Sequence, residues 1–109
     1  MTNHNKLIRD KIPDIIQKSG KKFTTRTLTN EEFLTELKKK IIEEAKEVEQ
    51  AKNKTELIEE LADIQELINA TLNQIGGTYE ELEQVRKTKK EKNGGFDKAI
   101  YLIEVEDEP

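Results

Sequence analysis

Two short acidic patterns lie on either side of a polar break in the middle of the chain. Glu44 and Glu47 form an ExxE pattern before the break, and Glu60 and Asp63 form an ExxD pattern after it. On a helix, side chains three positions apart project from neighbouring points of one face. An all-oxygen group of ligands without His or Cys suits a hard divalent ion, Mg²⁺ first and Mn²⁺ second. The four carboxylates are therefore candidate metal ligands and catalytic groups, provided that the fold brings them together.

The stretches that carry these patterns are predicted to be two long helices. A capping box begins at Thr29, and apolar residues then recur at helical intervals over roughly 30 to 52. After a short break at residues 53–54, Thr55 is the expected N-cap of a second helix. Its apolar stripe continues without interruption to the paired glycines at 76–77, which end it.

Helix geometry predicts that the four carboxylates converge. A connection of about two residues makes the helices antiparallel, which sets Glu47 level with Glu60 about 10 Å from the turn, and Glu44 level with Asp63 about 14 Å from it. At about 100° of rotation per residue, all four also lie on the same side of the two apolar stripes. Glu43 points about 160° away from the stripe, so it is the lesser catalytic candidate, available only to a neighbouring chain or to the surroundings of the site.

Ordinary surface glutamates are the alternative explanation, because 23 of the 109 residues are Asp or Glu. Either pattern alone would favour that explanation. The matched levels and the shared side across two helices favour the site instead. Four carboxylates at close quarters repel one another unless a cation lies among them, which again indicates a metal ion.

The rest of the chain completes an all-α prediction. Pro13 can open a short helix that ends at Ser19, and a third long helix should run from the capping box at Thr78 to residues 93–95. We expect one domain, an antiparallel helical bundle in which this third helix packs alongside the hairpin. A minor two-stranded β element would pair the β-prone segments 23–28 and 99–105.

Composition narrows the function classes. The net charge of −4 gives no basic field for duplex nucleic acid, and the absence of cysteine excludes disulfides and thiolate zinc sites. Nothing resembles a signal peptide or a membrane span, so the expected location is cytoplasmic. With only 33% hydrophobic residues, the chain buries little area by itself, and a homodimer or homotetramer is expected.

Three segments of the chain resemble one enzyme family. The run at 41–70 resembles the EExxE…ExxD signature of the all-α nucleoside triphosphate pyrophosphohydrolases, the MazG-like superfamily that includes phosphoribosyl-ATP pyrophosphohydrolase. The flanks at 5–16 and 93–106 look like those of its small stand-alone branch, described as phosphoribosyl-ATP pyrophosphohydrolase-like. One departure is Asn93, which stands where a basic residue would be expected before the paired glycines.

The resemblance implies hydrolysis of a nucleotide between its α and β phosphates, giving the monophosphate and pyrophosphate. It also implies Mg²⁺ as cofactor, held by the residues matching Glu44, Glu47, Glu60 and Asp63. Two other function classes stay open: a metal-stabilised helical regulatory or binding module without turnover, and a plain helical interaction protein. Mg²⁺-dependent release of pyrophosphate would distinguish the enzyme from both.

Basic residues in two segments could bind the phosphates of such a substrate, since an acidic site needs cations to hold a polyphosphate. The alternative is a solvated basic surface, which is the more common role for lysines on a helix. The candidates are Lys6, Arg9, Lys11, Lys89 and Lys92.

Overall fold

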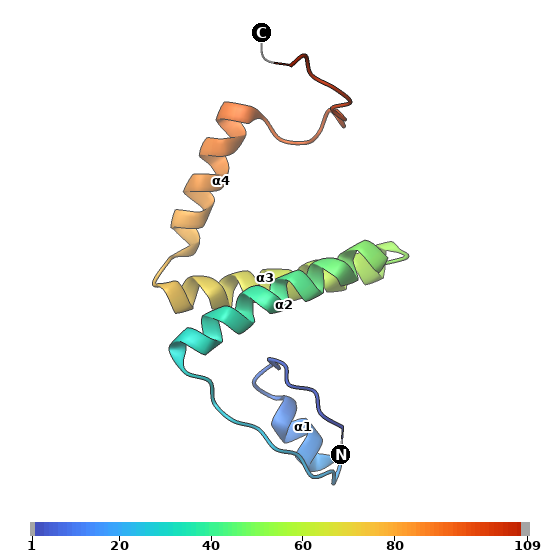
Figure 1. Ribbon diagram of the computed structural model, residues 1–109, viewed down its shortest axis with the longest axis vertical. Helices are drawn as coiled ribbons and strands as arrows, with labels where there is room; N and C mark the ends of the chain where they lie inside the picture. Colours follow the sequence, from blue (N-terminus) through green and yellow to red (C-terminus); the bar gives the residue numbers. More distant parts are fainter. Residues whose placement is uncertain (1, 108–109) are drawn as a thin grey trace. The chain divides into compact units, whose positions relative to one another are not determined.

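The computed structural model describes residues 2–107 and is all-α over that range, which confirms the predicted fold class. Residues 2–107 contain four helices, which can be followed in Figure 1. They are α1 (Ile12–Lys18), α2 (Asn30–Gln50), α3 (Lys54–Ile75) and α4 (Tyr79–Asn93). The chain divides between Gly77 and Thr78 into two compact units, the first with α1 to α3 and the second with α4, and each is described by itself.

Helices α2 and α3 form the hairpin at the centre of the first unit. Residues 51–53 connect them, and the two helices lie side by side over their length (Figure 1). Leu37 of α2 is the one large side chain fully buried among the described residues, with 1% of its surface exposed. The short connection makes the helices antiparallel, as predicted, and places the ExxE pattern beside the ExxD pattern.

The start of α2 is fixed by the predicted capping box. The Thr29 side chain accepts a hydrogen bond from the Glu32 N–H, and the Glu32 carboxylate accepts one from the Thr29 N–H at 3.0 Å. Both backbone donors would otherwise lack a partner in the helix. Arg26 also donates to both oxygens of the Glu32 carboxylate, at 3.1 and 2.8 Å, and so ties the preceding loop to the first turn of α2.

The start of α3 differs from the prediction by two residues. Asn53, and not Thr55, is the N-cap: its side-chain oxygen accepts from the Glu56 N–H at 2.9 Å. The Glu56 carboxylate in turn accepts from the Lys52 N–H at 2.9 Å, so the whole break is hydrogen-bonded. Asparagine is as strong an N-cap as serine and stronger than threonine, which explains why the helix begins earlier.

The end of α3 follows the glycine pair. Gly76 adopts the left-handed conformation, with φ of 71°, and the Gly77 N–H donates to the Leu72 carbonyl at 2.9 Å. This hydrogen-bond pattern is a Schellman ending, in which glycine avoids the steric cost that a Cβ would bring.

The amino-terminal segment turns directly into α1. The Ile12 N–H donates to the Arg9 carbonyl at 3.1 Å, and Pro13 occupies the first turn of the helix, as predicted. Leu7 and Ile8 are half-buried, whereas Arg9 is exposed. The backbone around Arg9 is therefore held in a turn while its side chain projects outward.

The predicted two-stranded element is wrong, because residues 2–107 contain no strand. Residues 23–28 belong to the first unit and 99–105 to the second. Ile100 and Tyr101 are 82% and 89% exposed, so the second unit by itself gives that segment no packed face. An isolated pair of strands is marginal in water without a packed face, and β propensity alone does not supply one.

The second unit begins as the sequence indicates. Thr78 caps α4 by accepting from the Glu81 N–H at 3.1 Å, and the helix stops at Asn93, before Gly94. Because the two units are described separately, the packing of this helix alongside the hairpin stays a prediction.

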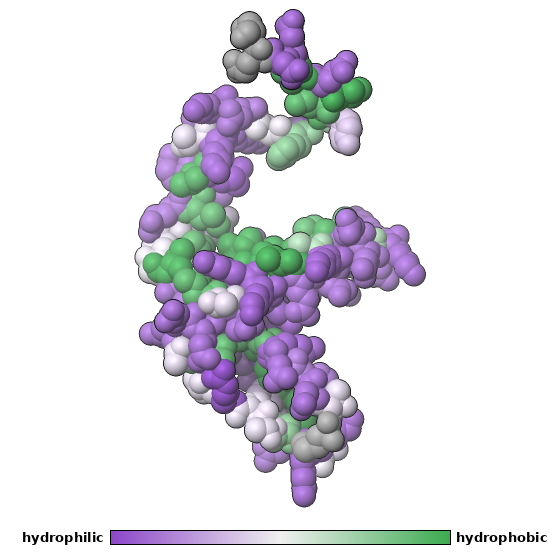
Figure 2. Space-filling view, viewed as in Figure 1, coloured by the Kyte–Doolittle hydropathy of each residue, from purple (hydrophilic) through white to green (hydrophobic). Residues whose placement is uncertain are grey.

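Taken by itself, the first unit exposes a large apolar surface on the hairpin. Figure 2 shows apolar side chains reaching the surface along its α3 side. Leu57, Ile58, Leu61 and Ile75 of α3 all have more than a third of their surface exposed, and Ile42 of α2 is 60% exposed. In the part of the chain that the structure describes, no helix is long and apolar enough to cross a membrane.

Candidate metal centre

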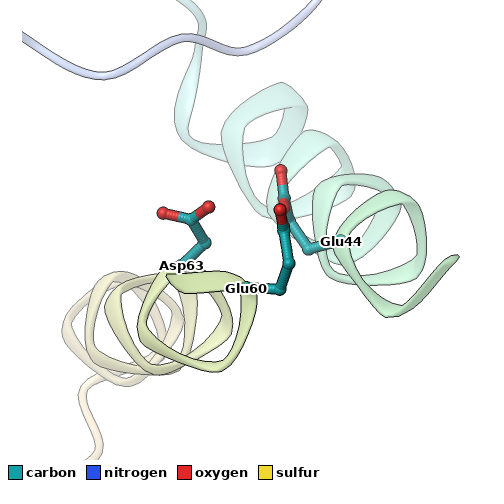
Figure 3. Close-up of side chains that lie close together, drawn as sticks. All are labelled: Glu44, Glu60 and Asp63. Atoms are coloured by element: carbon teal, nitrogen blue, oxygen red, sulfur yellow. The ribbon is translucent and has the colours of Figure 1, made fainter. Parts of the chain in front are cut away.

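Three of the four predicted carboxylates come together between the two helices of the hairpin. Glu44 projects from α2, and Glu60 and Asp63 project from α3 toward the same side (Figure 3). Each offers a carboxylate oxygen within 4.8 Å of the other two, and each is half-buried. The three residues are called the acidic group below.

The electrostatics of Glu60 show that the acidic group carries excess negative charge. The pKa of Glu60 is raised, first because partial burial disfavours its charged form and then because it shares a hydrogen bond with Glu44. The charges of Glu44, Asp63 and Glu47 raise the same pKa further. A proton or a cation among these carboxylates relieves the repulsion, so the group favours any positive species that reaches it.

The donor set fits a hard divalent ion. All its donors are carboxylate oxygens from Asp and Glu, the ligands that Mg²⁺ and Mn²⁺ prefer, and the group itself contains neither imidazole nor thiolate to favour zinc or copper. Mg²⁺ usually keeps several waters and takes only a few carboxylates, so a partly exposed group of three matches its needs. The same ligands would accept Mn²⁺.

Glu47 and Glu43 lie differently from the acidic group. Glu47 is exposed and outside the group of three, although its charge acts on Glu60. A hydrogen bond with the Glu44 carboxyl contributes to the raised pKa of Glu60, whereas Glu47 acts on that pKa through its charge. Glu43 is exposed, outside the group of three, and forms an ion pair with Lys40 of its own helix at 3.6 Å.

One predicted phosphate-binding residue lies at the acidic group. The Arg9 guanidinium donates to Oδ1 of Asp63 at 2.6 Å, and the side chains are 61% and 40% exposed. Figure 3 shows the amino-terminal segment passing the open side of the three carboxylates. The segment before α1 therefore supplies a cation beside the candidate metal ligands.

The other predicted phosphate-binding residues lie in the same segment as Arg9 or in the second unit. Lys6 and Lys11 belong to the same segment as Arg9 and are exposed, and neither forms an ion pair within residues 2–107. Lys89 and Lys92 lie on α4, in the second unit, and are exposed. Their roles, like the ligand and catalytic roles of the carboxylates, stay predictions.

The contact between Arg9 and Asp63 has no signal in the sequence. The two residues are 54 positions apart, and Arg9 lies outside any helix, so neither spacing nor helical periodicity relates them. Only the family-like segment around Arg9 made it a candidate at all.

Comparison with known proteins identifies the family. Residues 5–93 match the family model described as phosphoribosyl-ATP pyrophosphohydrolase, and the match contains the acidic group, Arg9 and all four helices in full. No curated protein and no solved structure matches the chain. Residues 94–106, which also look like a family flank, lie beyond the match and add nothing to it. Since the model covers well over half of the chain, the protein belongs to the phosphoribosyl-ATP pyrophosphohydrolase family, enzymes that hydrolyse a phosphoanhydride bond.

Proposed function

We propose that this enzyme is a Mg²⁺-dependent nucleotide pyrophosphohydrolase that cleaves between the α and β phosphates, giving a monophosphate and pyrophosphate. The family supplies the reaction class. The observation that supports the metal dependence is the convergence of Glu44, Glu60 and Asp63 from two helices to within 4.8 Å. The surplus of negative charge there would repel a polyphosphate unless a cation intervened.

In this proposal the acidic group holds the ion and the residues around it handle the substrate. Bound Mg²⁺ would neutralise the polyphosphate and lower the pKa of the attacking water. Glu47 is exposed and its charge acts on Glu60, and in this proposal it would complete the ligand set or accept the proton from that water. Water adds to the α phosphorus, the bond from that phosphorus to the bridging oxygen breaks, and pyrophosphate leaves.

A pyrophosphate-release assay tests the proposal. The substrates are phosphoribosyl-ATP, which the family description names, and the common ribo- and deoxynucleoside triphosphates, each with and without Mg²⁺. We expect release from at least one of them only when Mg²⁺ or Mn²⁺ is present. Release of orthophosphate in place of pyrophosphate would contradict cleavage between the α and β phosphates.

A thermal melt beside this assay distinguishes the enzyme from a metal-stabilised binding module without turnover. A ligand that binds only the native state raises stability by mass action, so either protein should melt at a higher temperature in millimolar Mg²⁺. Only the enzyme should also release pyrophosphate. A plain helical interaction protein would respond to Mg²⁺ in neither measurement.

A further inference from the structure

The ion pair between Arg9 and Asp63 joins the acidic group to a segment far away in the sequence. Within residues 2–107, this is the one hydrogen bond that the Arg9 side chain makes, and Asp63 accepts it through Oδ1. Both side chains are substantially exposed, at 61% and 40%. Exposed ion pairs contribute little to stability, so this contact can break without loss of the fold.

The backbone at Arg9 is better held than its side chain. The Arg9 carbonyl accepts from the Ile12 N–H at 3.1 Å, and the Lys11 carbonyl accepts from the Ile15 N–H at 3.2 Å. These bonds tie the segment to α1, while the half-buried Leu7 and Ile8 precede it. The guanidinium can therefore change partners by rotation of its side chain while its main chain stays in place.

Charge decides which partner the guanidinium prefers. Without a metal ion, the carboxylates of the acidic group attract Arg9. A divalent ion among those carboxylates removes most of that attraction and repels the guanidinium at short range. A polyphosphate bound to the ion brings new negative charge, and a guanidinium binds phosphate oxygens through a fork of N–H donors.

We propose that Arg9 has two positions: it pairs with Asp63 while the acidic group lacks a metal ion, and it transfers to the phosphates of the substrate once the ion has taken Asp63 as a ligand. Arg9 thus competes with the metal for Asp63 and cooperates with it in holding the nucleotide. The inference deepens the proposed function and rests on it. If Arg9 behaves in this way, the metal ion binds first and the nucleotide second.

Metal affinity without nucleotide tests the first position. We expect Arg9→Gln to bind Mn²⁺ about two- to fivefold more tightly than the wild type in calorimetric titration, because a weak competing contact is lost. Lys18→Gln removes one positive charge from the last turn of α1 and serves as the control, with unchanged affinity. Unchanged or weaker Mn²⁺ binding by Arg9→Gln would overturn the competition, since an arginine that merely orients Asp63 as a ligand predicts the weakening.

Binding of a base-free polyphosphate tests the second position. With Mn²⁺ saturating, Arg9→Gln should bind inorganic tripolyphosphate at least about tenfold more weakly than the wild type, because a charge-assisted hydrogen bond is lost. Arg9→Lys keeps the charge without the fork of N–H donors, so its tripolyphosphate affinity should lie between those of the wild type and Arg9→Gln. Arg9→Gln should therefore tighten the binding of Mn²⁺ and weaken the binding of tripolyphosphate. Equal tripolyphosphate affinity in wild type and Arg9→Gln would overturn the transfer.

These titrations separate failure of this inference from failure of the proposed function. If the wild type releases pyrophosphate in a Mg²⁺-dependent way but Arg9→Gln shows neither effect, only the two positions of Arg9 are wrong. If the wild type binds no Mn²⁺ at all, both proposals are overturned together.

Discussion

At the scale of single residues, Glu47 is the carboxylate whose role the structure makes most testable. It lies outside the acidic group, yet its charge helps to raise the pKa of Glu60. Glu47→Gln keeps the shape of the side chain and removes that charge. The metal-free protein should therefore become as stable or slightly more stable, while turnover falls about a hundredfold or more if Glu47 is a ligand or the proton acceptor.

The measurement is a thermal melt in EDTA beside pyrophosphate release in saturating Mg²⁺. Glu43→Gln is the matched control, because Glu43 is on the same helix, lies outside the acidic group and is not among the charges that raise the pKa of Glu60. Near-wild-type turnover of Glu47→Gln would remove Glu47 from the proposed site.

The residues of the site were predictable to the extent that helical geometry determines them. Spacing and rotation placed Glu44, Glu60 and Asp63 on one side of a hairpin, and the structure brings these three together. The same geometry does not set rotamers, so it does not show that Glu47, the fourth predicted carboxylate, lies outside the acidic group and is exposed. Nor did it relate Arg9 to Asp63, because that contact depends on the path of a non-helical segment.

At the scale of elements, the helix ends followed from their capping residues. The capping box at Thr29, the N-cap hydrogen bond at Thr78 and the glycine ending at Gly76 are local features, determined by hydrogen bonds within a few residues. Asn53 was missed because the sequence offers two adequate N-caps close together. The expected strands failed because a strand needs a partner elsewhere in the chain, which local propensity does not supply.

The cap of α2 gives a prediction on pH. The hydrogen bonds from the Arg26 side chain and then from the Thr29 N–H lower the pKa of Glu32 from 4.5 to about 2. The unfolded chain therefore binds a proton more readily than the folded one, and this contribution to stability is complete above pH 4.5 and is lost as the pH falls toward 2. Glu32→Gln should lower stability at neutral pH and flatten the loss of stability between those two values.

Denaturant unfolding across this pH range provides the measurement. Glu31→Gln, at the neighbouring position in the first turn of α2, removes a charge that makes no capping contact. Its free energy of unfolding should depend on pH as steeply as that of the wild type. If stability falls equally steeply with pH in Glu32→Gln and in the wild type, the ion pair between Glu32 and Arg26 does not stabilise the fold.

At the scale of the whole molecule, the exposed apolar surface predicts self-association. Only Leu37 is fully buried among large side chains of the described residues, while Leu61 and Ile42 are half or more exposed. Patches of this kind on soluble domains usually mark interfaces. We expect a homodimer or homotetramer at micromolar concentration by size-exclusion chromatography with light scattering, and a stable monomer would contradict this.

Substitution of one exposed apolar residue refines that test. Leu61→Glu on α3 should shift the population toward monomer, because a charge within an apolar interface has no partner. Lys54→Glu, at the polar start of α3, is the control. An unaltered oligomer of Leu61→Glu would place the interface elsewhere.

The central claim is that the acidic group binds the divalent ion on which pyrophosphate release depends. Its most direct test is the Mg²⁺ dependence of pyrophosphate release by Glu60→Gln beside wild type, since Glu60 contacts Glu44 and responds to the charges of Asp63 and Glu47. Because glutamine is a weaker Mg²⁺ ligand than glutamate, Glu60→Gln should need about tenfold more Mg²⁺, or a still higher concentration, for half-maximal release. Its maximal rate should also be lower. An unchanged Mg²⁺ requirement with full activity in Glu60→Gln would contradict the claim.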